Sequence, residues 1–199
     1  MREIKRITNP IFKELLELKI VSKKNIVRLS ASTRDKKIPV YKDLKSGVIF
    51  LEKYTADTKY YETVKYKDGI GNVIEKSKRK INFIKTFKGN IKSANLENDK
   101  RRFFQFKKIL KNKKILDFGC GWGGFLKQIT EAKLLTGIEL REECIAYIKK
   151  KIKKIEVTNN INNLNEKYDI ITLFHVLEHI PYQIEILKKI KKQLSKNGK

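Results

Sequence analysis

A short apolar run that ends in an acid and passes directly into a glycine-rich turn is the feature that most limits what this chain can fold into. Residues 114–118 read K-I-L-D-F, residues 119–124 read G-C-G-W-G-G, and a helical pattern follows over Phe125–Ala132. Glycines let a chain turn sharply and let a ligand approach the backbone closely. This order predicts a strand, a ligand-binding turn and a helix of an α/β protein.

Alternating strand and helix patterns continue on both sides of this turn. A helix is predicted over Leu96–Lys111, with Asn95 as its N-cap. Further strands are predicted at Leu134–Leu140, Lys154–Val157 and Tyr168–Phe174, and further helices at Glu142–Lys153 and Ile184–Leu194. Strands that alternate with helices predict a Rossmann-like, doubly wound and mostly parallel sheet.

The first 94 residues carry weaker signals and are interpreted as an N-terminal α+β extension, distinct from a ligand-binding domain over residues 95–199. Short strands are predicted at Ile26–Leu29 and Val48–Leu51, with a turn at Lys45–Gly47. The segment Asp57–Lys65 fits either a helix or a strand, and residues 70–95 fit a loop with some helix. The extension is expected to cap or partner the second domain.

Two acids distinguish between possible ligands of the glycine turn. Gly119, Gly121 and Gly124 satisfy the dinucleotide pattern G-x-G-x-x-G, which alone is a weak signal. Asp117, at the end of the preceding strand, would repel the pyrophosphate of a dinucleotide but would attract a cation. Glu139 ends the next predicted strand, where a carboxylate can accept hydrogen bonds from ribose hydroxyls. The pair therefore favours an adenosine cofactor with a cationic amino-acid end.

Four segments together resemble the class I S-adenosylmethionine-dependent methyltransferases. Residues 115–125 are similar to the first motif of that family, and residues 136–139 to the segment that follows it. Residues 168–181, which read Y-D-I-I-T-L-F-H-V-L-E-H-I-P, resemble the fourth strand and its loop. Residues 194–198 resemble the turn before the fifth strand. The resemblance covers roughly residues 95–199.

This resemblance implies S-adenosylmethionine as the cofactor and assigns a set of residues to its pocket. The glycines would line the cofactor, Glu139 would hold its ribose, and Asn160 or Ile161 would lie beside the adenine, where many relatives have an acid. The implied cofactor-binding residues are Asp117, Gly119, Cys120, Gly121, Trp122, Gly123, Glu139, Leu140, Asn160, Ile161, Phe174 and His175.

A cluster of two histidines and an acid follows the predicted fourth strand. His175, Glu178 and His179 match the H-x-x-E-H pattern of some zinc proteases, but that reading needs a long helix, and here a strand precedes and Pro181 follows. No metal is therefore expected. A neutral imidazole beside a carboxylate can act as a general base, so His179 and Glu178 are the candidate catalytic residues. The alternative is that they only orient the loop and the cofactor.

The net charge of +25 raises the question of a nucleic-acid partner. Lysine far outnumbers arginine and is spread along the chain, which is typical of solvated helix faces. The Asn/Asp-Pro-Pro-Tyr/Phe motif of many nucleic-acid methylases is missing where His175–Glu178 stand. A nucleic-acid substrate is thus disfavoured. No membrane segment or signal peptide is evident, and two cysteines give no disulfide framework, so the cytoplasm is expected.

Two further features bear on the substrate and on activity. Residues 40–51 are similar to the zinc-ribbon strand found before some sugar and small-molecule methyltransferases, with Asp43 and Ser46 where cysteines would stand. This favours a sugar or nucleotide-sugar acceptor. The chain also ends where the family begins its fifth strand, which predicts a fragment with weak or no turnover and an unpaired sheet edge open to association. The function is thus predicted as methyl transfer to a small molecule, with a non-catalytic cofactor-binding module and an RNA methyltransferase as alternatives.

Overall fold

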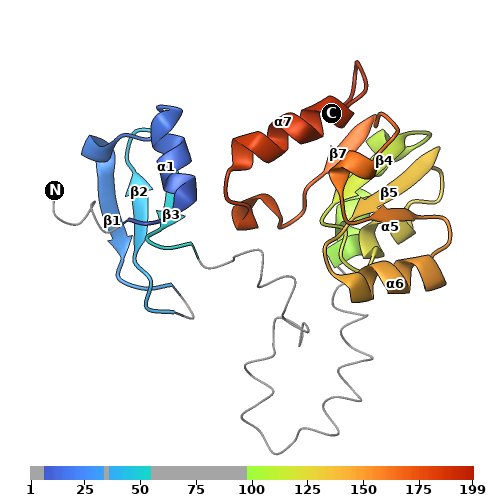
Figure 1. Cartoon of the computed structure of the whole chain (residues 1–199), viewed down its shortest axis with the longest axis horizontal. Helices are drawn as coiled ribbons and strands as arrows, with labels where there is room; N and C mark the ends of the chain where they lie inside the picture. The colour runs from blue at the N-terminus through green and yellow to red at the C-terminus, as the bar shows by residue number, and fades with distance from the viewer. Residues whose placement is uncertain (1–6, 34–35, 55–97) are drawn as a thin grey trace, which may run out of the picture. The chain divides into compact units, whose positions relative to one another are not determined.

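The computed structural model describes residues 7–33, 36–54 and 98–199, which form two compact units. The first unit contains the described residues up to 54 together with residues 179–186, and the second contains residues 98–178 and 187–199 (Figure 1). Each unit has its own sheet and its own hydrophobic core. The domain boundary predicted near residue 94 lies outside the described residues, as do the predictions for Asp57–Lys65 and residues 70–95. Within the described ranges, no helix is both long enough and apolar enough to cross a membrane.

A four-stranded parallel sheet with the strand order β6-β5-β4-β7 forms the centre of the second unit. Its strands are β4 (Lys114–Phe118), β5 (Leu134–Ile138), β6 (Glu156–Thr158) and β7 (Ile170–Thr172). The register places Ile115 of β4 opposite Leu135 of β5 on one side and opposite Ile170 of β7 on the other. The predicted Rossmann-like α/β fold is confirmed. Because the carboxyl ends of parallel strands share one edge, the residues that follow β4, β5 and β7 meet there.

Helices connect these strands and complete the core of the second unit. Its helical segments are residues 98–110, α5 (Gly124–Gln128), α6 (Glu142–Lys151), η3 (Ile161–Asn163), η4 (Leu177–His179) and α7 (Gln183–Gln193), the last two continuing into residues 179–186 of the first unit. The centre of the core is fully buried at Ile115, Leu126 and Ile148, which come from β4, α5 and α6. Burial of one such side chain contributes about 1.5–3 kcal/mol, so this cluster anchors the glycine turn between β4 and α5.

Some predicted elements are longer than the observed ones. The helix predicted at Phe125–Ala132 ends at Gln128, because the β-branched Ile129 takes an extended conformation. The strand predicted to reach Leu140 ends at Ile138. The predicted fourth strand keeps only Ile170–Thr172 as a regular strand. The third strand begins two residues later than predicted, at Glu156.

The last residue of the chain lies along the outer edge of β7. The backbone N–H of Lys199 donates to the carbonyl of Asp169 at 2.9 Å, and the carbonyl of Lys199 accepts from the N–H of Ile171 at 2.9 Å. A single residue that bonds two positions of its neighbour in this way follows the parallel-ladder pattern. Part of the β7 edge is therefore paired within this chain, and association through the edge stays a prediction.

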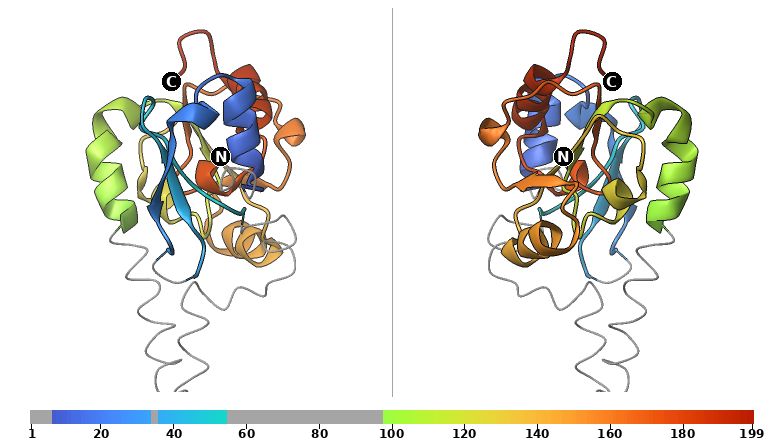
Figure 2. Two further views of the ribbon diagram at one scale, coloured as in Figure 1. Left: turned by 90° about the vertical axis from the view of Figure 1, so that its left-hand side faces the viewer. Right: turned by 90° about the vertical axis from the view of Figure 1, so that its right-hand side faces the viewer.

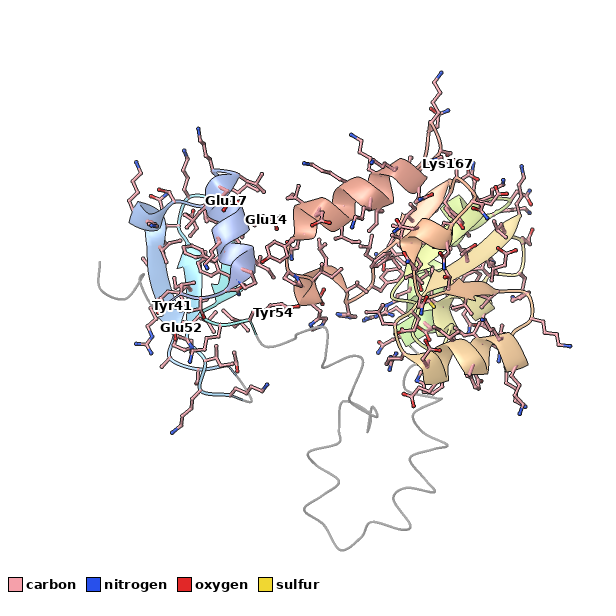
Figure 3. The ribbon with its side chains drawn as sticks, viewed as in Figure 1. Glu14, Glu17, Tyr41, Glu52, Tyr54 and Lys167 are labelled. Atoms are coloured by element: carbon pink, nitrogen blue, oxygen red, sulfur yellow. The ribbon has the colours of Figure 1, made fainter. Side chains whose placement is uncertain are left out.

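The first unit contains a three-stranded antiparallel sheet packed against one helix. The strands β1 (Ile26–Ser30), β2 (Val40–Asp43) and β3 (Ile49–Leu51) are paired in that order (Figure 2), after the helix α1 (Pro10–Glu17) and the short η2 (Lys23–Asn25). Phe12 of α1 stacks on Phe50 of β3 with ring centroids 4.7 Å apart. The Tyr41 hydroxyl donates to Glu52 at 3.2 Å (Figure 3). The two strands predicted here from the sequence are confirmed.

The helix α1 was missed by the sequence analysis although it carries a recognisable start signal. The side chain of Asn9 accepts a hydrogen bond from the N–H of Ile11 at 3.0 Å, and Pro10 occupies the first helical turn. The Asn9 amide also donates to the carbonyl of Leu51 at 3.0 Å, which fastens the helix start to β3. An Asn-Pro pair before an apolar helical pattern is the signal that would have located it.

The carboxylate of Asp43 organises the turn between β2 and β3. It accepts hydrogen bonds from the backbone N–H groups of Ser22, Lys45 and Ser46 at 2.9, 2.9 and 2.7 Å, and from the Ser46 hydroxyl at 3.1 Å. These bonds, above all the one from Ser46, lower the pKa of Asp43. The two positions at which a zinc ribbon has cysteines are therefore joined here by hydrogen bonds.

We expect Asp43→Asn to loosen the first unit more than Ser46→Ala does. The first variant weakens four hydrogen bonds, whereas the second removes two, the hydroxyl bond to Asp43 and a 3.4 Å bond from the N–H of Val48. Since the pKa of Asp43 is lowered, its contribution is present at neutral pH and disappears as the pH falls through that lowered pKa. Amide hydrogen exchange at Ser22 and Lys45 measures the effect in this unit alone. Equal exchange in the two variants would contradict the role given to the carboxylate.

Candidate cofactor site

The glycine turn after β4 has a backbone that only glycine adopts easily. Gly119 and Gly121 have φ angles of 81° and 55°. A Cβ atom on Gly119 would lie 2.3 Å from Cγ2 of Val176, in the loop after β7. The N–H groups of Gly119 and Cys120 both donate to the carbonyl of Ile138, at 2.8 and 2.9 Å. The turn is thus held against β5 on one side and against the β7 loop on the other.

Asp117 lies buried beneath this turn, with only 3 % of its surface exposed. Its Oδ1 accepts a hydrogen bond from the Thr172 hydroxyl on β7 at 2.6 Å. Burial raises the pKa of Asp117 to about 7, and the Thr172 bond and the Arg102 charge only partly oppose this. A buried carboxyl of this kind becomes easier to ionise when a cation is placed near it, and harder when an anion is.

Glu139 follows β5 directly and turns its carboxylate toward the glycine turn. Oε2 accepts from the N–H of Gly121 at 2.8 Å, while Oε1 accepts from the N–H groups of Leu140 and Arg141 at 3.0 and 3.1 Å. The Arg141 guanidinium also contacts both oxygens, at 3.2 and 3.4 Å. Glu139 bonds its own following backbone, which explains why the strand stops at Ile138.

Aromatic side chains frame the turn on two sides. Phe174, just after β7, contacts Phe125 of α5 edge-on with centroids 5.0 Å apart, and the Arg102 guanidinium lies 4.8 Å from the Phe174 ring. Trp122 contacts Tyr147 of α6 edge-on at 5.4 Å. These contacts hold the aromatic side chains in place on either side of the glycine backbone.

Comparison with known proteins identifies the family of this chain. Residues 92–199, more than half of the chain, match the family described as methyltransferase domain. The chain belongs to this methyltransferase family. The two acids fit the cofactor expected from the sequence: Asp117, buried beneath the glycine turn, suits a cationic ligand, and the Glu139 carboxylate lies beside the turn after β5.

Relatives of this methyltransferase domain include two bacterial proteins named ubiquinone biosynthesis O-methyltransferase. The one from Coxiella burnetii strain Dugway 5J108-111 is 27 % identical over 122 residues, which cover 56 % of this chain and 52 % of the relative. The one from Hydrogenovibrio crunogenus is 31 % identical over 104 residues, covering 47 % and 43 %. The chain spans about half the length of these curated relatives.

Solved structures with a similar arrangement include the magnesium protoporphyrin IX methyltransferase from Synechocystis PCC 6803, crystallised with bound S-adenosylmethionine. It is 16 % identical to this chain, and the alignment covers 69 % of each chain with a TM-score of 0.48. The plantazolicin methyltransferase BpumL, crystallised with S-adenosylhomocysteine and a pentazolic desmethylPZN analog, is 27 % identical over 69 % of this chain and 52 % of its own, with a TM-score of 0.42.

The three members of the histidine cluster do not form a single group in the structure. Nδ1 of His175 lies 3.4 Å from Oε1 of Glu178, and both side chains are more than half exposed. His179 groups with the first unit, where its carbonyl accepts a hydrogen bond from the Tyr54 hydroxyl. In the same unit the N–H of Ile184 donates to Glu14 of α1 at 3.0 Å (Figure 3). The structure therefore pairs Glu178 with His175.

The remaining pocket residues expected from the sequence fall into two groups. Cys120 is buried against Gly137 of β5, and this burial strongly raises the pKa of its thiol. Ile161 is buried, whereas Leu140 is exposed. Asn160 is also exposed, and its side-chain carbonyl accepts from the N–H of Asn162 at 2.9 Å. That carbonyl is therefore engaged within its own loop.

Three charged residues near the glycine turn were not anticipated as site residues. The carboxylate of Asp99 packs against Gly124, where an added Cβ would lie 1.9 Å from its Oδ2, and Arg102 pairs with Asp99 at 3.5 Å. Burial raises the pKa of Asp99. Arg141 contacts Glu139 as described above. Asp99 and Arg102 come from the helix at 98–110, which reaches the turn only through tertiary packing, so no local motif marks them.

We expect the buried Asp117 to make the stability of the methyltransferase domain depend on pH. Its folded pKa of about 7 exceeds the ordinary value of 3.8, so the contribution is complete below about pH 4 and is lost as the pH rises toward 7. This difference in pKa corresponds to at most roughly 4 kcal/mol of unfolding free energy. Asp117→Asn, neutral at every pH, should therefore be more stable than the unmodified protein at pH 8 and similar to it near pH 4. Urea unfolding of both proteins at the two pH values measures this, and a constant difference between them would contradict the assignment.

Proposed function

We propose that this chain carries the cofactor-binding part of an enzyme that transfers a methyl group from S-adenosylmethionine to a hydroxyl oxygen of a small molecule. The observation that carries the proposal is the placement of two acids around one glycine turn. Asp117 lies buried beneath the turn, and Glu139 is fixed beside it by the N–H of Gly121. The cytoplasm, where the free Cys120 and Cys144 would stay reduced, is included in this proposal.

The roles of this chain's residues follow from their chemistry. Bound S-adenosylmethionine would supply an activated methyl group on its sulfonium. The backbone at Gly121 would admit the cofactor, Gly119 would shape the turn beside it, and Asp117 would favour a cationic group over a phosphate. Glu139 would accept the ribose hydroxyls. These residues bind and orient, and orientation is the main requirement of a direct methyl transfer.

A hydroxyl acceptor also needs a group that takes its proton. His179 is the base proposed from the sequence, and the structure adds a second imidazole that is oriented by an acid, His175 with Glu178 at 3.4 Å. A carboxylate on one ring nitrogen leaves the other nitrogen free to accept a proton. His175 follows β7 at the carboxyl edge of the sheet, which is where ligands of such sheets bind.

The acceptor class draws support from the relatives, whose names describe O-methylation in ubiquinone biosynthesis. A hydroxylated small molecule is the coarser description that we carry over to this chain. The sugar or nucleotide-sugar acceptor suggested by residues 40–51 falls within that class. The hydrogen-bonded Asp43 turn shows that this segment keeps a defined shape without cysteines.

Incubation of the full chain with methyl-labelled S-adenosylmethionine and separate acceptor pools tests this proposal. The pools are phenols, nucleotide sugars and RNA. We expect label in one of the two small-molecule pools and loss of that label in the His175→Ala, His179→Ala double variant. Label in RNA would contradict the acceptor class. Binding of the cofactor without label in any pool would favour the non-catalytic module instead.

A further inference from the structure

We propose that Arg141 is a built-in occupant of the ribose position, holding the Glu139 carboxylate in the cofactor-free protein until the ribose hydroxyls displace it. The inference rests on the proposed function and adds to it a residue that controls access to the cofactor site. The basis of the inference is the number of donors around the Glu139 carboxylate. Five N–H donors contact the two oxygens of Glu139, three on Oε1 and two on Oε2.

A carboxylate offers about four lone-pair positions, two on each oxygen. The backbone N–H groups of Gly121, Leu140 and Arg141 take three of these positions, at 2.8–3.1 Å. The Arg141 guanidinium takes what is left, at 3.2 and 3.4 Å. While the guanidinium is in place, Glu139 therefore has no acceptor position left for a ribose hydroxyl.

The two kinds of donor differ in their freedom to leave. The three backbone donors belong to the glycine turn and to the start of α6, so they cannot leave Glu139 without local unfolding. The guanidinium is at the end of a flexible side chain, and its bonds are the two longest. The backbone bonds alone are enough to orient the carboxylate. The guanidinium is consequently the partner that a hydroxyl group of the ligand would replace.

The position of the guanidinium supports this exchange. Its Nη2 lies 3.5 Å from where a Cβ of Gly121 would be, so it lies over the part of the turn where an absent side chain leaves room for a ligand. The side chains of Arg141 and Glu139 are 15 % and 9 % exposed. An ion pair that is largely removed from water gains little over its desolvation cost, so a neutral donor can replace it without a large loss.

Removal of the guanidinium should therefore tighten cofactor binding. We expect Arg141→Ala to bind S-adenosylhomocysteine roughly three- to tenfold more tightly than the unmodified chain, as measured by calorimetry, because no ion pair has to be broken. Arg141→Lys keeps the charge without the bidentate contact, and its affinity should lie between those of Arg141→Ala and the unmodified chain. Lys111→Ala is the matched control: it removes one exposed cation that pairs with Glu131 at 2.8 Å, outside the site, and should not change the affinity.

A second measurement reports on the Arg141 side chain directly. In the free protein the Nε–H proton of Arg141 should exchange slowly with water in NMR spectra, and saturation with S-adenosylhomocysteine should make it exchange quickly. Weaker or equal binding by Arg141→Ala would overturn the inference, as would a fast-exchanging Nε–H in the free protein. If neither the variant nor the unmodified chain bound S-adenosylhomocysteine, the proposed function would be refuted and the displacement with it. Binding with equal affinity would refute the displacement alone.

Discussion

Replacement of Glu139 by alanine lowers the affinity for S-adenosylhomocysteine by about a hundredfold or more. The expected loss is large because a hydrogen bond to a charged acceptor is worth roughly 1.5–3 kcal/mol, and the ribose would lose this bond. The N–H groups of Gly121 and Leu140 would lose their acceptor as well. Part of the effect would therefore be a less ordered turn.

Two companion variants separate these contributions. Glu139→Gln keeps the size and one acceptor oxygen, so it should retain more order but still bind weakly. Glu166→Ala removes an exposed acid that pairs with Lys114 at 2.6 Å away from the turn, and it should leave the affinity unchanged. Calorimetric titration of the three variants, each checked for folding by circular dichroism, gives the comparison. Binding by Glu139→Ala within a few-fold of the unmodified chain would show that this carboxylate does not hold the ribose.

Replacement of Gly119 by alanine strongly destabilises the second unit. A side chain at φ 81° costs about 1–3 kcal/mol in backbone strain. The new Cβ would also lie 2.3 Å from Cγ2 of Val176, and overpacking of this kind typically costs about 1–3 kcal/mol more. Val176 cannot rotate away easily, because a β-branched side chain is stiff about its first torsion. The strain and the overpacking together cost a large part of the unfolding free energy of a typical domain.

The strain and the overlap can be measured apart. Gly47 has a similar φ of 76° with nothing within 4 Å of an added Cβ, so Gly47→Ala shows the effect of strain alone. The double variant Gly119→Ala, Val176→Ala removes the overlapping methyl groups and should recover part of the lost stability. Thermal and urea unfolding of all three proteins provide the test. No recovery in the double variant would mean that the β7 loop does not pack on the turn as described.

The strand, glycine turn and helix of the candidate site were predictable because their signals are local. Asp117 and Glu139 each end a strand, and the glycines between them have backbone angles that other residues avoid. Such features depend on a few neighbouring residues, which a single sequence displays directly. The order of strands and longer helices from residue 114 to residue 194 followed from the same kind of pattern. The errors were the ends of elements and the two short helical segments η3 and η4, which were not predicted.

Side-chain competition explains the clearest of those errors. The apolar pattern through Leu140 predicted a longer strand, but Glu139 accepts hydrogen bonds from the next two backbone N–H groups and so ends the ladder. The pairing of Arg141 with Glu139 depends on one side-chain rotamer beside the turn. A sequence pattern contains no information about that choice, so this contact was visible only in the structure.

Long-range packing explains the rest. Asp99 and Arg102 reach the site because the helix at 98–110 packs beside β4 and α5, and no motif records this. The separation of His179 from His175 and Glu178 likewise depends on tertiary packing. The Tyr54 hydroxyl donates a hydrogen bond to the carbonyl of His179, which is 125 residues away in the sequence. The assignment of His179 and Glu178 as catalytic residues therefore stays a prediction.

The measurement that tests the central claim most directly is calorimetric titration of the full chain with S-adenosylhomocysteine and, separately, with NADH. The account predicts roughly micromolar binding of S-adenosylhomocysteine and no binding of NADH, because Asp117 beneath the turn disfavours a pyrophosphate. Binding of NADH by the folded protein, without binding of S-adenosylhomocysteine, would contradict the assignment of this site.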